Sequence, residues 1–190
     1  MSVTDVFQRI AAALKHAGIQ YMVSGSFASS YYGAQRSTRD IDLVIDATPS
    51  QLRTLADDLR GDQYYFELDS ALESLRRQSL SNIIDFATGW KIDLIFLKSR
   101  PYDQEAFRRR QPIKMHDVDL FIASVEDTII SKLEWSKMGQ SQRQLEDVAV
   151  MLQAESESLD RSYLKKWITE LAVQKQWEDA RQLAGITEFL

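Results

Sequence analysis

The sequence predicts an α/β protein in two parts, an α/β lobe over residues 1–123 and a helical lobe over residues 124–190. Up to residue 123, strand-like runs alternate with short helical patterns, whereas only helical periodicity follows. The chain has 190 residues and an apolar content of 44%, which is ordinary for a globular protein. A chain of this length buries roughly two thirds of its unfolded surface. We therefore expect a core that needs no disulfide or metal to form.

The first part begins with a helix, a strand and a glycine turn. Apolar residues spaced on one face predict a helix from about residue 4, and Gly18 ends it. Residues 19–23 are predicted to form a short buried strand. This strand runs into Gly25-Ser26, which opens a helix over residues 27–32. A strand, a tight turn and a helix start thus follow one another.

The next elements are defined by helix-start signals. A strand over residues 41–45 precedes a helix that Thr48 caps and that continues to about residue 60. Residues 64–68 are predicted to form another strand. The spacing from Ser70 to Glu73 is that of a capping box and predicts a short helix starting there.

Two hairpins and a series of helices complete the predicted elements. Residues 82–87 and 90–97 flank Thr88-Gly89, which has the composition of a tight hairpin turn. Residues 113–115 and 118–122 flank His116-Asp117, and the neighbouring Pro112 favours an edge strand. Beyond residue 123 we expect helices at roughly 125–138, 141–153, 160–172 and 175–184.

Composition excludes several kinds of site. The chain has no cysteine, which rules out disulfides, thiolate zinc sites, iron–sulfur clusters and a cysteine nucleophile. The two histidines, His16 and His116, are too few for an all-histidine metal site, and we expect both to be structural or exposed. Any bound metal should therefore be a hard cation with oxygen ligands.

Charge and hydropathy bear on partners and location. The net charge of -5 argues against a general nucleic-acid coat, because affinity for phosphate backbones depends mainly on basic side chains. The arginines at 108–110 form the most obvious basic run, predicted to be a solvated face unless a polyanionic acceptor binds there. No apolar run approaches the ~20 residues of a membrane span, and residues 1–10 lack a signal-peptide pattern. We expect a cytoplasmic protein without a membrane partner.

The strand over residues 41–45 begins among carboxylates. Asp40 and Asp42 are two residues apart on a strand, so their side chains point to the same face. Two adjacent like charges disfavour each other's ionisation unless a cation lies between them. Mg²⁺ would meet that need, since it prefers carboxylate, water and phosphate oxygens. The alternative is that both aspartates merely form ion pairs with Arg36 and Arg39.

Gly25-Ser26, thirteen intervening residues and Asp40-Ile-Asp-Leu43 together resemble the motif of the nucleotidyltransferase superfamily typified by DNA polymerase beta. The wider stretch GSFASSYYGAQRSTRDIDLVI is similar to AbiEii-type toxins of abortive-infection and toxin–antitoxin systems, and Arg36-Ser-Thr-Arg-Asp40 resembles their Arg-x-Thr-x-Asp run. Ser24 departs from the superfamily motif, which usually has an apolar residue before the glycine.

The resemblance implies a mixed sheet flanked by helices, with Asp40 and Asp42 as ligands of Mg²⁺ or Mn²⁺ and a third carboxylate on a later strand. We expect Asp93 to be this third ligand, with Asp85 as the rival. A two-residue turn at Thr88-Gly89 would place these two acids on opposite faces of the hairpin, with Ile84 opposite Asp93 and Asp85 opposite Ile92. The face that carries Asp93 is the more polar one.

The resemblance also assigns nucleotide-binding roles. Gly25, Ser26 and nearby backbone amides would hold the nucleotide phosphates, and Arg36 and Lys132 would offset their charge. Lys132 matches a phosphate-binding lysine on a helix of the toxin-like families. Asp147 is similar to an aspartate that those families place on the next helix.

The predicted reaction is transfer of a nucleoside monophosphate from an NTP to a hydroxyl acceptor, with Asp40, Asp42 and Asp93 as the catalytic set and two metal ions as cofactors. The acceptor is left open among RNA such as tRNA, a protein and a small molecule, and a cognate antitoxin is a candidate partner. Two alternatives to this reaction stay open. The first is a non-catalytic nucleotide-binding or antitoxin-like protein of the same fold. The second is a magnesium-dependent phosphohydrolase.

Overall fold

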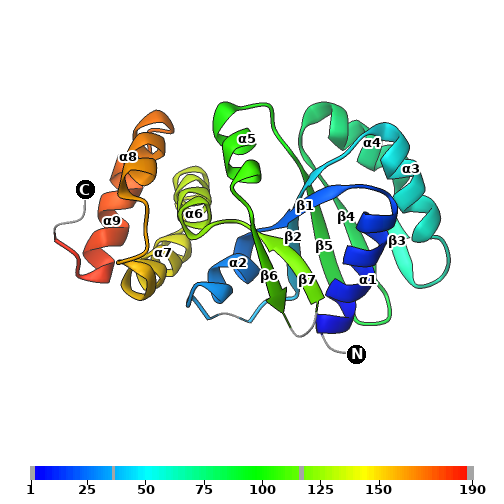
Figure 1. The fold of residues 1–190 in the computed structure, drawn as a ribbon, viewed down its shortest axis with the longest axis horizontal. Coiled ribbons are helices and arrows are strands. Elements are labelled where there is room, and N and C mark those ends of the chain that lie inside the picture. Colours follow the sequence, from blue (N-terminus) through cyan, green and yellow to red (C-terminus); the bar gives the residue numbers. More distant parts are fainter. Residues whose placement is uncertain (1–2, 36, 116–117, 188–190) are drawn as a thin grey trace. The chain divides into compact units, whose positions relative to one another are not determined.

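The structure, a computed structural model, describes residues 3–35, 37–115 and 118–187 (Figure 1). The chain divides into two compact units. Unit 1 comprises residues 1–24 and 38–122, and unit 2 comprises residues 25–37 and 123–190. None of the helices in the described ranges is both long and apolar enough to cross a membrane.

Unit 1 is built on a mixed sheet, as predicted. Among the described residues it has seven strands in the order β3-β4-β5-β2-β1-β7-β6. β2 pairs in parallel with β5, and β1 pairs in parallel with β7, whereas the other neighbours are antiparallel. The strands are β1 (Gln20–Val23), β2 (Asp40–Asp46), β3 (Tyr64–Phe66), β4 (Leu80–Asp85), β5 (Trp90–Phe96), β6 (Gln111–Met115) and β7 (Val118–Ile122).

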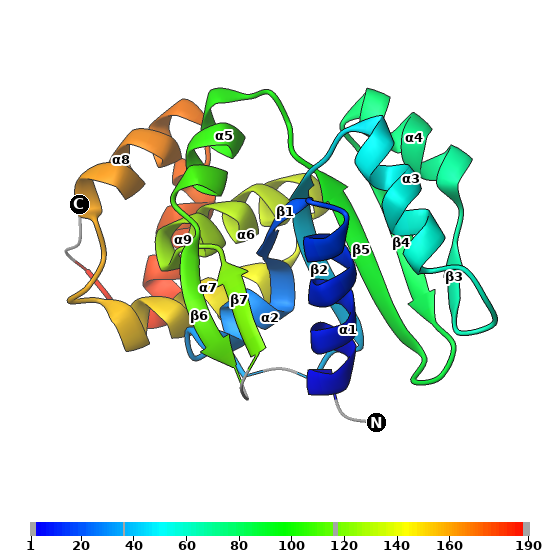
Figure 2. The same cartoon turned by 45° about the vertical axis from the view of Figure 1, so that its right-hand side comes forward.

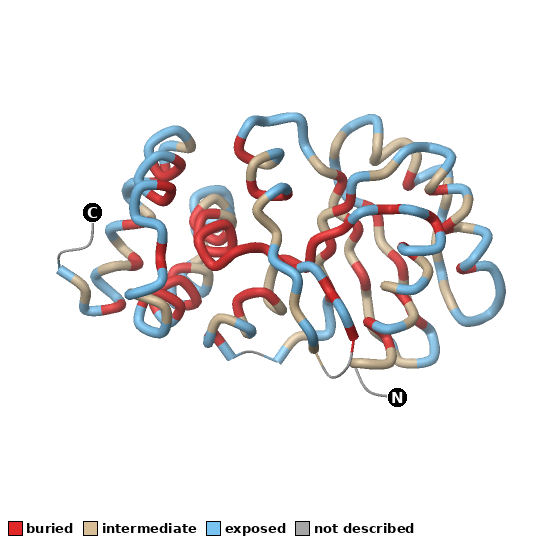
Figure 3. Tube along the Cα trace, viewed as in Figure 1, coloured by how far each residue is buried: buried red, intermediate tan, exposed pale blue. Residues whose placement is uncertain are grey.

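One face of this sheet carries the hydrophobic core of unit 1. The central strands alternate buried and partly exposed residues, which Figure 3 shows as alternating colours along each strand. Helices α1, α3 and α4 lie over one face (Figure 2). The buried strand residues are Ile41, Leu43, Ile45, Ile83, Ile92, Leu94 and Phe96. The helices of unit 1 are α1 (Val3–His16), α3 (Pro49–Asp58), α4 (Leu68–Arg77) and α5 (Pro101–Arg108).

Most helix starts follow the predicted signals, but α5 was not predicted, and the start of α4 differs from the prediction. Thr48 caps α3 in a capping box, in which the Gln51 side chain accepts a hydrogen bond of 2.8 Å from the Thr48 amide. The predicted start of α4 at Ser70 is wrong. The helix begins at Leu68, directly after Glu67, so Ser70 lies inside the first turn and cannot act as its cap.

The β4–β5 hairpin has a longer turn than predicted. Asp85 lies opposite Trp90 and Asn82 opposite Asp93, so the predicted register is wrong by two residues. The turn spans residues 86–89 because Asp85 organises it. The Asp85 Oδ1 accepts from the amide of Ala87 at 2.9 Å, and its carbonyl accepts from the amide of Gly89 at 2.7 Å. A shift of two residues preserves the faces, so Asp85 and Asp93 still point to opposite sides of the sheet.

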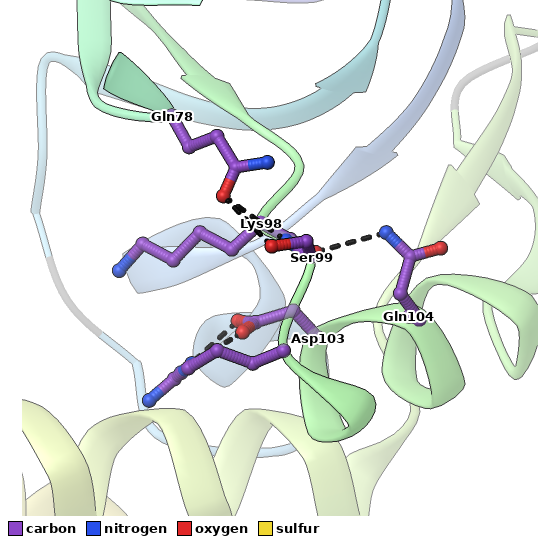
Figure 4. A network of polar contacts seen from close by, with 6 residues as sticks. Gln78, Lys98, Ser99, Asp103 and Gln104 are labelled. Atoms are coloured by element: carbon purple, nitrogen blue, oxygen red, sulfur yellow. Dashed lines mark hydrogen bonds and ion pairs between the residues drawn. The ribbon is translucent and has the colours of Figure 1, made fainter. Parts of the chain in front are cut away.

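The segment that follows β5 is tied to α4 and α5 by polar contacts (Figure 4). Gln78, in the left-handed conformation at the end of α4, accepts hydrogen bonds from the amide and hydroxyl of Ser99, both at 3.2 Å. Gln104 donates to the carbonyl of Lys98 at 2.9 Å. Arg100 pairs with Asp103 within the first turn of α5. These contacts fix the chain where it leaves β5.

Unit 2 consists of helices in its described part: α2 (Gly25–Tyr31), α6 (Val125–Gly139), α7 (Gln142–Glu155), α8 (Arg161–Glu170) and α9 (Gln174–Ala184). The last four match the predicted helices to within a few residues. The segment that contains α2 packs with them. The Tyr32 hydroxyl donates to the carbonyl of Ala123 at 2.8 Å, and a Cβ added at Gly33 would lie 3.3 Å from that of Ala154.

Candidate functional site

Three carboxylates lie on one face of two adjacent parallel strands in unit 1. β2 carries Asp40 and Asp42, and β5 carries Asp93. Asp42 stands opposite Asp93 in the register, and Asp40 stands opposite Lys91. Because side chains alternate along a strand, all four point to the face opposite the buried isoleucines and leucines. The structure therefore places the three predicted carboxylates on one face of two neighbouring strands.

The alternation of apolar and polar residues along both strands determines which face these side chains occupy. In both strands the alternate positions are large apolar residues that the core buries, so a slip of one residue would put the carboxylates into the core. The start of β2 is fixed locally. The Asp40 amide donates to Thr38 Oγ1 at 3.1 Å, and the Lys91 amide donates to the carbonyl of Arg39 at 3.1 Å. Ser24 extends the neighbouring strand by donating from its amide to the Asp42 carbonyl at 2.9 Å.

Lys91 supplies the positive charge on this face. Its ammonium lies 2.9 Å from Asp93 Oδ2 and 3.7 Å from Asp40 Oδ1. The hydrogen bond to Asp93, followed by the charges of Asp93, Asp40 and Asp42, raises the pKa of Lys91 against the lowering effect of partial burial. The ammonium is therefore charged at neutral pH. Sequence reasoning missed this contact, although Lys91 stands two residues before Asp93 and so shares its strand face.

Carboxylate oxygens are the kind of ligand that a hard divalent cation prefers. Asp93 has a side chain only 14% exposed, and its Oδ1 is buried without a hydrogen-bond partner among the described residues. A buried carboxylate oxygen in this state has unused acceptor capacity. In the described ranges, no three histidine or acidic residues are already gathered as a metal cluster. The ammonium of Lys91 lies between the carboxylates of Asp93 and Asp40 on this face.

Asp85 has a different environment from Asp93. Its side chain is 1% exposed and forms an ion pair with Arg9 of α1. Arg9 also donates to the Tyr64 hydroxyl at 2.8 Å. Asp85 thus links a helix, a strand and a hairpin turn on the core side of the sheet, away from the face that carries the other carboxylates.

The predicted phosphate-binding residues at the glycine turn belong to unit 2. Gly25 begins α2 with φ of 59°, a left-handed conformation that favours glycine because a Cβ would clash there. Ser26 is partly exposed, and its carbonyl accepts from the Ser29 hydroxyl at 3.1 Å. Arg36 lies outside the described residues.

Lys132 and Asp147 form a buried ion pair within unit 2. The Lys132 ammonium lies 2.8 Å from Asp147 Oδ2 and 3.0 Å from Gln144 Oε1, and the side chains of Lys132 and Asp147 are each 6% exposed. An ammonium has three N–H donors. Two of them are used here, and the third has no acceptor among the described residues. Sequence reasoning singled out both charged residues but not their pairing.

Arg110 and His16 make contacts within unit 1. Arg110 lies over the ring of Phe107 at 4.3 Å and donates to Gln20 Oε1 at 2.8 Å, so the prediction of a wholly solvated arginine run is wrong for this residue. His16 pairs with Asp58 at 2.7 Å and links α1 to α3. His116 lies outside the described residues.

Comparison with solved structures identifies the architecture. The antibiotic-resistance factor ANT(2'')-Ia, an aminoglycoside nucleotidyltransferase, matches with a TM-score of 0.55 at 13% identity, over 96% of this chain and 98% of that chain. The same protein in complex with adenylyl-2''-tobramycin matches with a TM-score of 0.50 at 10% identity, over 97% of this chain and 98% of that chain. The chain has the nucleotidyltransferase fold.

This result confirms the predicted superfamily resemblance at the level of the fold, and the resemblance to AbiEii-type toxins stays a prediction. A nucleotidyltransferase-like protein from Paracoccidioides brasiliensis also matches, with a TM-score of 0.49 at 18% identity over 97% of this chain and 93% of that chain. No protein-family model matches the sequence, and no curated protein matches it.

Proposed function

We propose that this protein transfers a nucleoside monophosphate from an NTP to a hydroxyl acceptor, with release of pyrophosphate. The observation that carries the proposal is the set of Asp40, Asp42 and Asp93 on one face of two strands in register. The nucleotidyltransferase fold supports the reaction class, because ANT(2'')-Ia has the same fold and one of its structures contains adenylyl-2''-tobramycin. A fold alone does not determine a function, so the carboxylates carry more weight.

In this proposal Asp40, Asp42 and Asp93 would hold Mg²⁺ or Mn²⁺, and the bound ion would offset the negative charge of the phosphates. Asp93 would also take the proton of the acceptor hydroxyl. The acceptor oxygen forms a bond to the α-phosphorus. The bond from that phosphorus to the pyrophosphate oxygen breaks, and pyrophosphate leaves with the electron pair.

The triphosphate is assigned to residues of the glycine turn and to two basic side chains. Gly25 lacks the Cβ that would keep phosphate from its backbone, and Ser26 adds a hydroxyl donor. Lys132 would donate through its third N–H while Asp147 and Gln144 hold the other two. Arg36 would offset the remaining charge. These assignments rest on the motif resemblance.

The acceptor is proposed only as a class, namely a hydroxyl of RNA such as tRNA, of a protein or of a small molecule. A role in a toxin–antitoxin or phage-defence system is the biological setting that the AbiEii-like stretch suggests. Co-purification with the product of a neighbouring gene would test for a cognate antitoxin.

The reaction class is tested with NTPs labelled at either the α or the γ phosphate, each of the four bases in turn, with Mg²⁺ or Mn²⁺ and total RNA or lysate. Nucleotidyl transfer places the α label on an acceptor and releases the γ label as pyrophosphate. Release of the γ label as orthophosphate would instead indicate a phosphohydrolase. NTP binding without transfer to any acceptor would indicate a non-catalytic protein.

A further inference from the structure

Lys91 contacts carboxylates of both β2 and β5 on this face of unit 1. Its ammonium reaches Asp93 on its own strand and Asp40 on the neighbouring strand, at 2.9 and 3.7 Å. Its side chain is 42% exposed, and that of Asp40 is 56% exposed, so the contact is open to solvent on one side.

A cation is needed at this position. Three carboxylates on adjacent positions of two parallel strands repel one another, and desolvation of Asp93 increases the cost. The ammonium of Lys91 has three N–H donors and one positive charge, so it reduces this repulsion. A divalent ion would bring twice that charge. The stem of a lysine is flexible, so its head can leave the carboxylates without any change in the backbone.

We propose that Lys91 is an internal counter-cation that holds Asp93 and Asp40 in the metal-free protein and competes with the divalent ion for them. The inference rests on the proposed function, because it takes these carboxylates as the metal ligands. Lys91 is then a positioning residue whose removal strengthens metal binding, whereas removal of a ligand weakens it. A divalent ion and an ammonium that share the same oxygens also repel each other, which lowers the metal affinity of the wild-type protein.

The test measures Mn²⁺ binding to the full chain without nucleotide, by isothermal titration calorimetry or by electron paramagnetic resonance of free Mn²⁺. Lys91→Met removes the charge and keeps the length of the side chain. We expect its Mn²⁺ dissociation constant to fall by about tenfold or more relative to wild type, which corresponds to about 1.4 kcal/mol. In the absence of metal this variant should melt at a lower temperature, and saturating Mn²⁺ should restore it.

Two matched variants isolate the charge. Lys91→Arg keeps a cation at the position and should bind Mn²⁺ with an affinity close to that of wild type. Lys98→Met removes an exposed lysine that follows the same strand and should leave the affinity unchanged. Tighter binding by Lys91→Arg would contradict the role of the charge.

The outcomes separate this inference from the proposed function. If wild type binds Mn²⁺, Asp42→Asn does not, and Lys91→Met binds no more tightly than wild type, the role of Lys91 is wrong and the metal site stands. If wild type, Lys91→Met and Asp42→Asn all fail to bind Mn²⁺, the metal site and the role of Lys91 are both wrong.

Discussion

Asp85 and Asp93 show how the same side chain takes two roles within one hairpin. Asp85 is buried and anchors Arg9 and the turn, whereas Asp93 faces the other side of the sheet beside Lys91. The sequence predicted that they lie on opposite faces. This prediction is correct although the register was wrong, because a shift by two residues does not change which face a residue occupies. The sequence could not show that Arg9, 76 residues away along the chain, pairs with Asp85.

Substitution of these two aspartates should separate stability from function. Asp85→Asn should lower the free energy of unfolding by about 1–3 kcal/mol, because the buried pair with Arg9 loses its charge. Asp93→Asn should cost at most about 1 kcal/mol, because its partner Lys91 is partly exposed. Urea unfolding measures both. Equal losses in the two variants would contradict the assignment of Asp85 as the structural residue.

The buried pair of Lys132 and Asp147 gives a second prediction at this scale. Lys132→Met should lower the free energy of unfolding by about 3–5 kcal/mol, because it leaves the carboxylate of Asp147 in a buried site without its ammonium. The double variant Lys132→Met with Asp147→Leu should be more stable than Lys132→Met alone. A double-mutant cycle in urea measures the coupling. Additive losses would mean that the two side chains do not depend on each other.

At the scale of elements, alternation and capping signals predicted most helices and strands. The patterns over residues 41–45 and 90–97 are strict enough to define both the strands and their faces. Turn chemistry was harder to predict. Thr88-Gly89 has the composition of a two-residue turn, but the side chain of Asp85 captures the amide of Ala87 and lengthens the turn. A local side-chain contact of this kind competes with the hairpin pattern and has no periodic signal.

Helices α3 and α6 each begin at a hydroxyl side chain that caps the first turn, and they allow a paired test. Thr48→Ala should cost about 1 kcal/mol, because the cap is exposed and water can replace it. Ser124→Ala should cost about 2–3 kcal/mol, because Ser124 is buried and also donates to the carboxylate of Asp127 at 2.8 Å. Urea unfolding of the two variants measures the difference. A larger loss for Thr48→Ala would contradict the importance of burial.

At the scale of the whole molecule, the sequence indicated an α/β part followed by helices, and the structure adds a partition that periodicity cannot show. The segment that contains α2 packs within unit 2, and its Tyr32 donates a hydrogen bond to the carbonyl of Ala123, 91 residues further along the chain. Such long-range packing depends on shape and not on local pattern. Asp40 and Asp42 could be predicted to share a face from their spacing alone. The contact of Lys91 with Asp40 depends on the pairing of β5 with β2, which the spacing does not show.

The central claim is that the carboxylates of β2 and β5 make this fold a nucleotidyl-transfer enzyme. The most direct measurement compares transfer of α-labelled NTP to an acceptor by wild type, Asp42→Asn and Asp46→Asn. Asp46 lies at the other end of β2 and is exposed, so it provides a matched loss of charge on the same strand. We expect Asp46→Asn to transfer like wild type and Asp42→Asn to lose at least about a hundredfold in rate, while both remain folded. Equal transfer by the two variants, or loss in both, would contradict the claim.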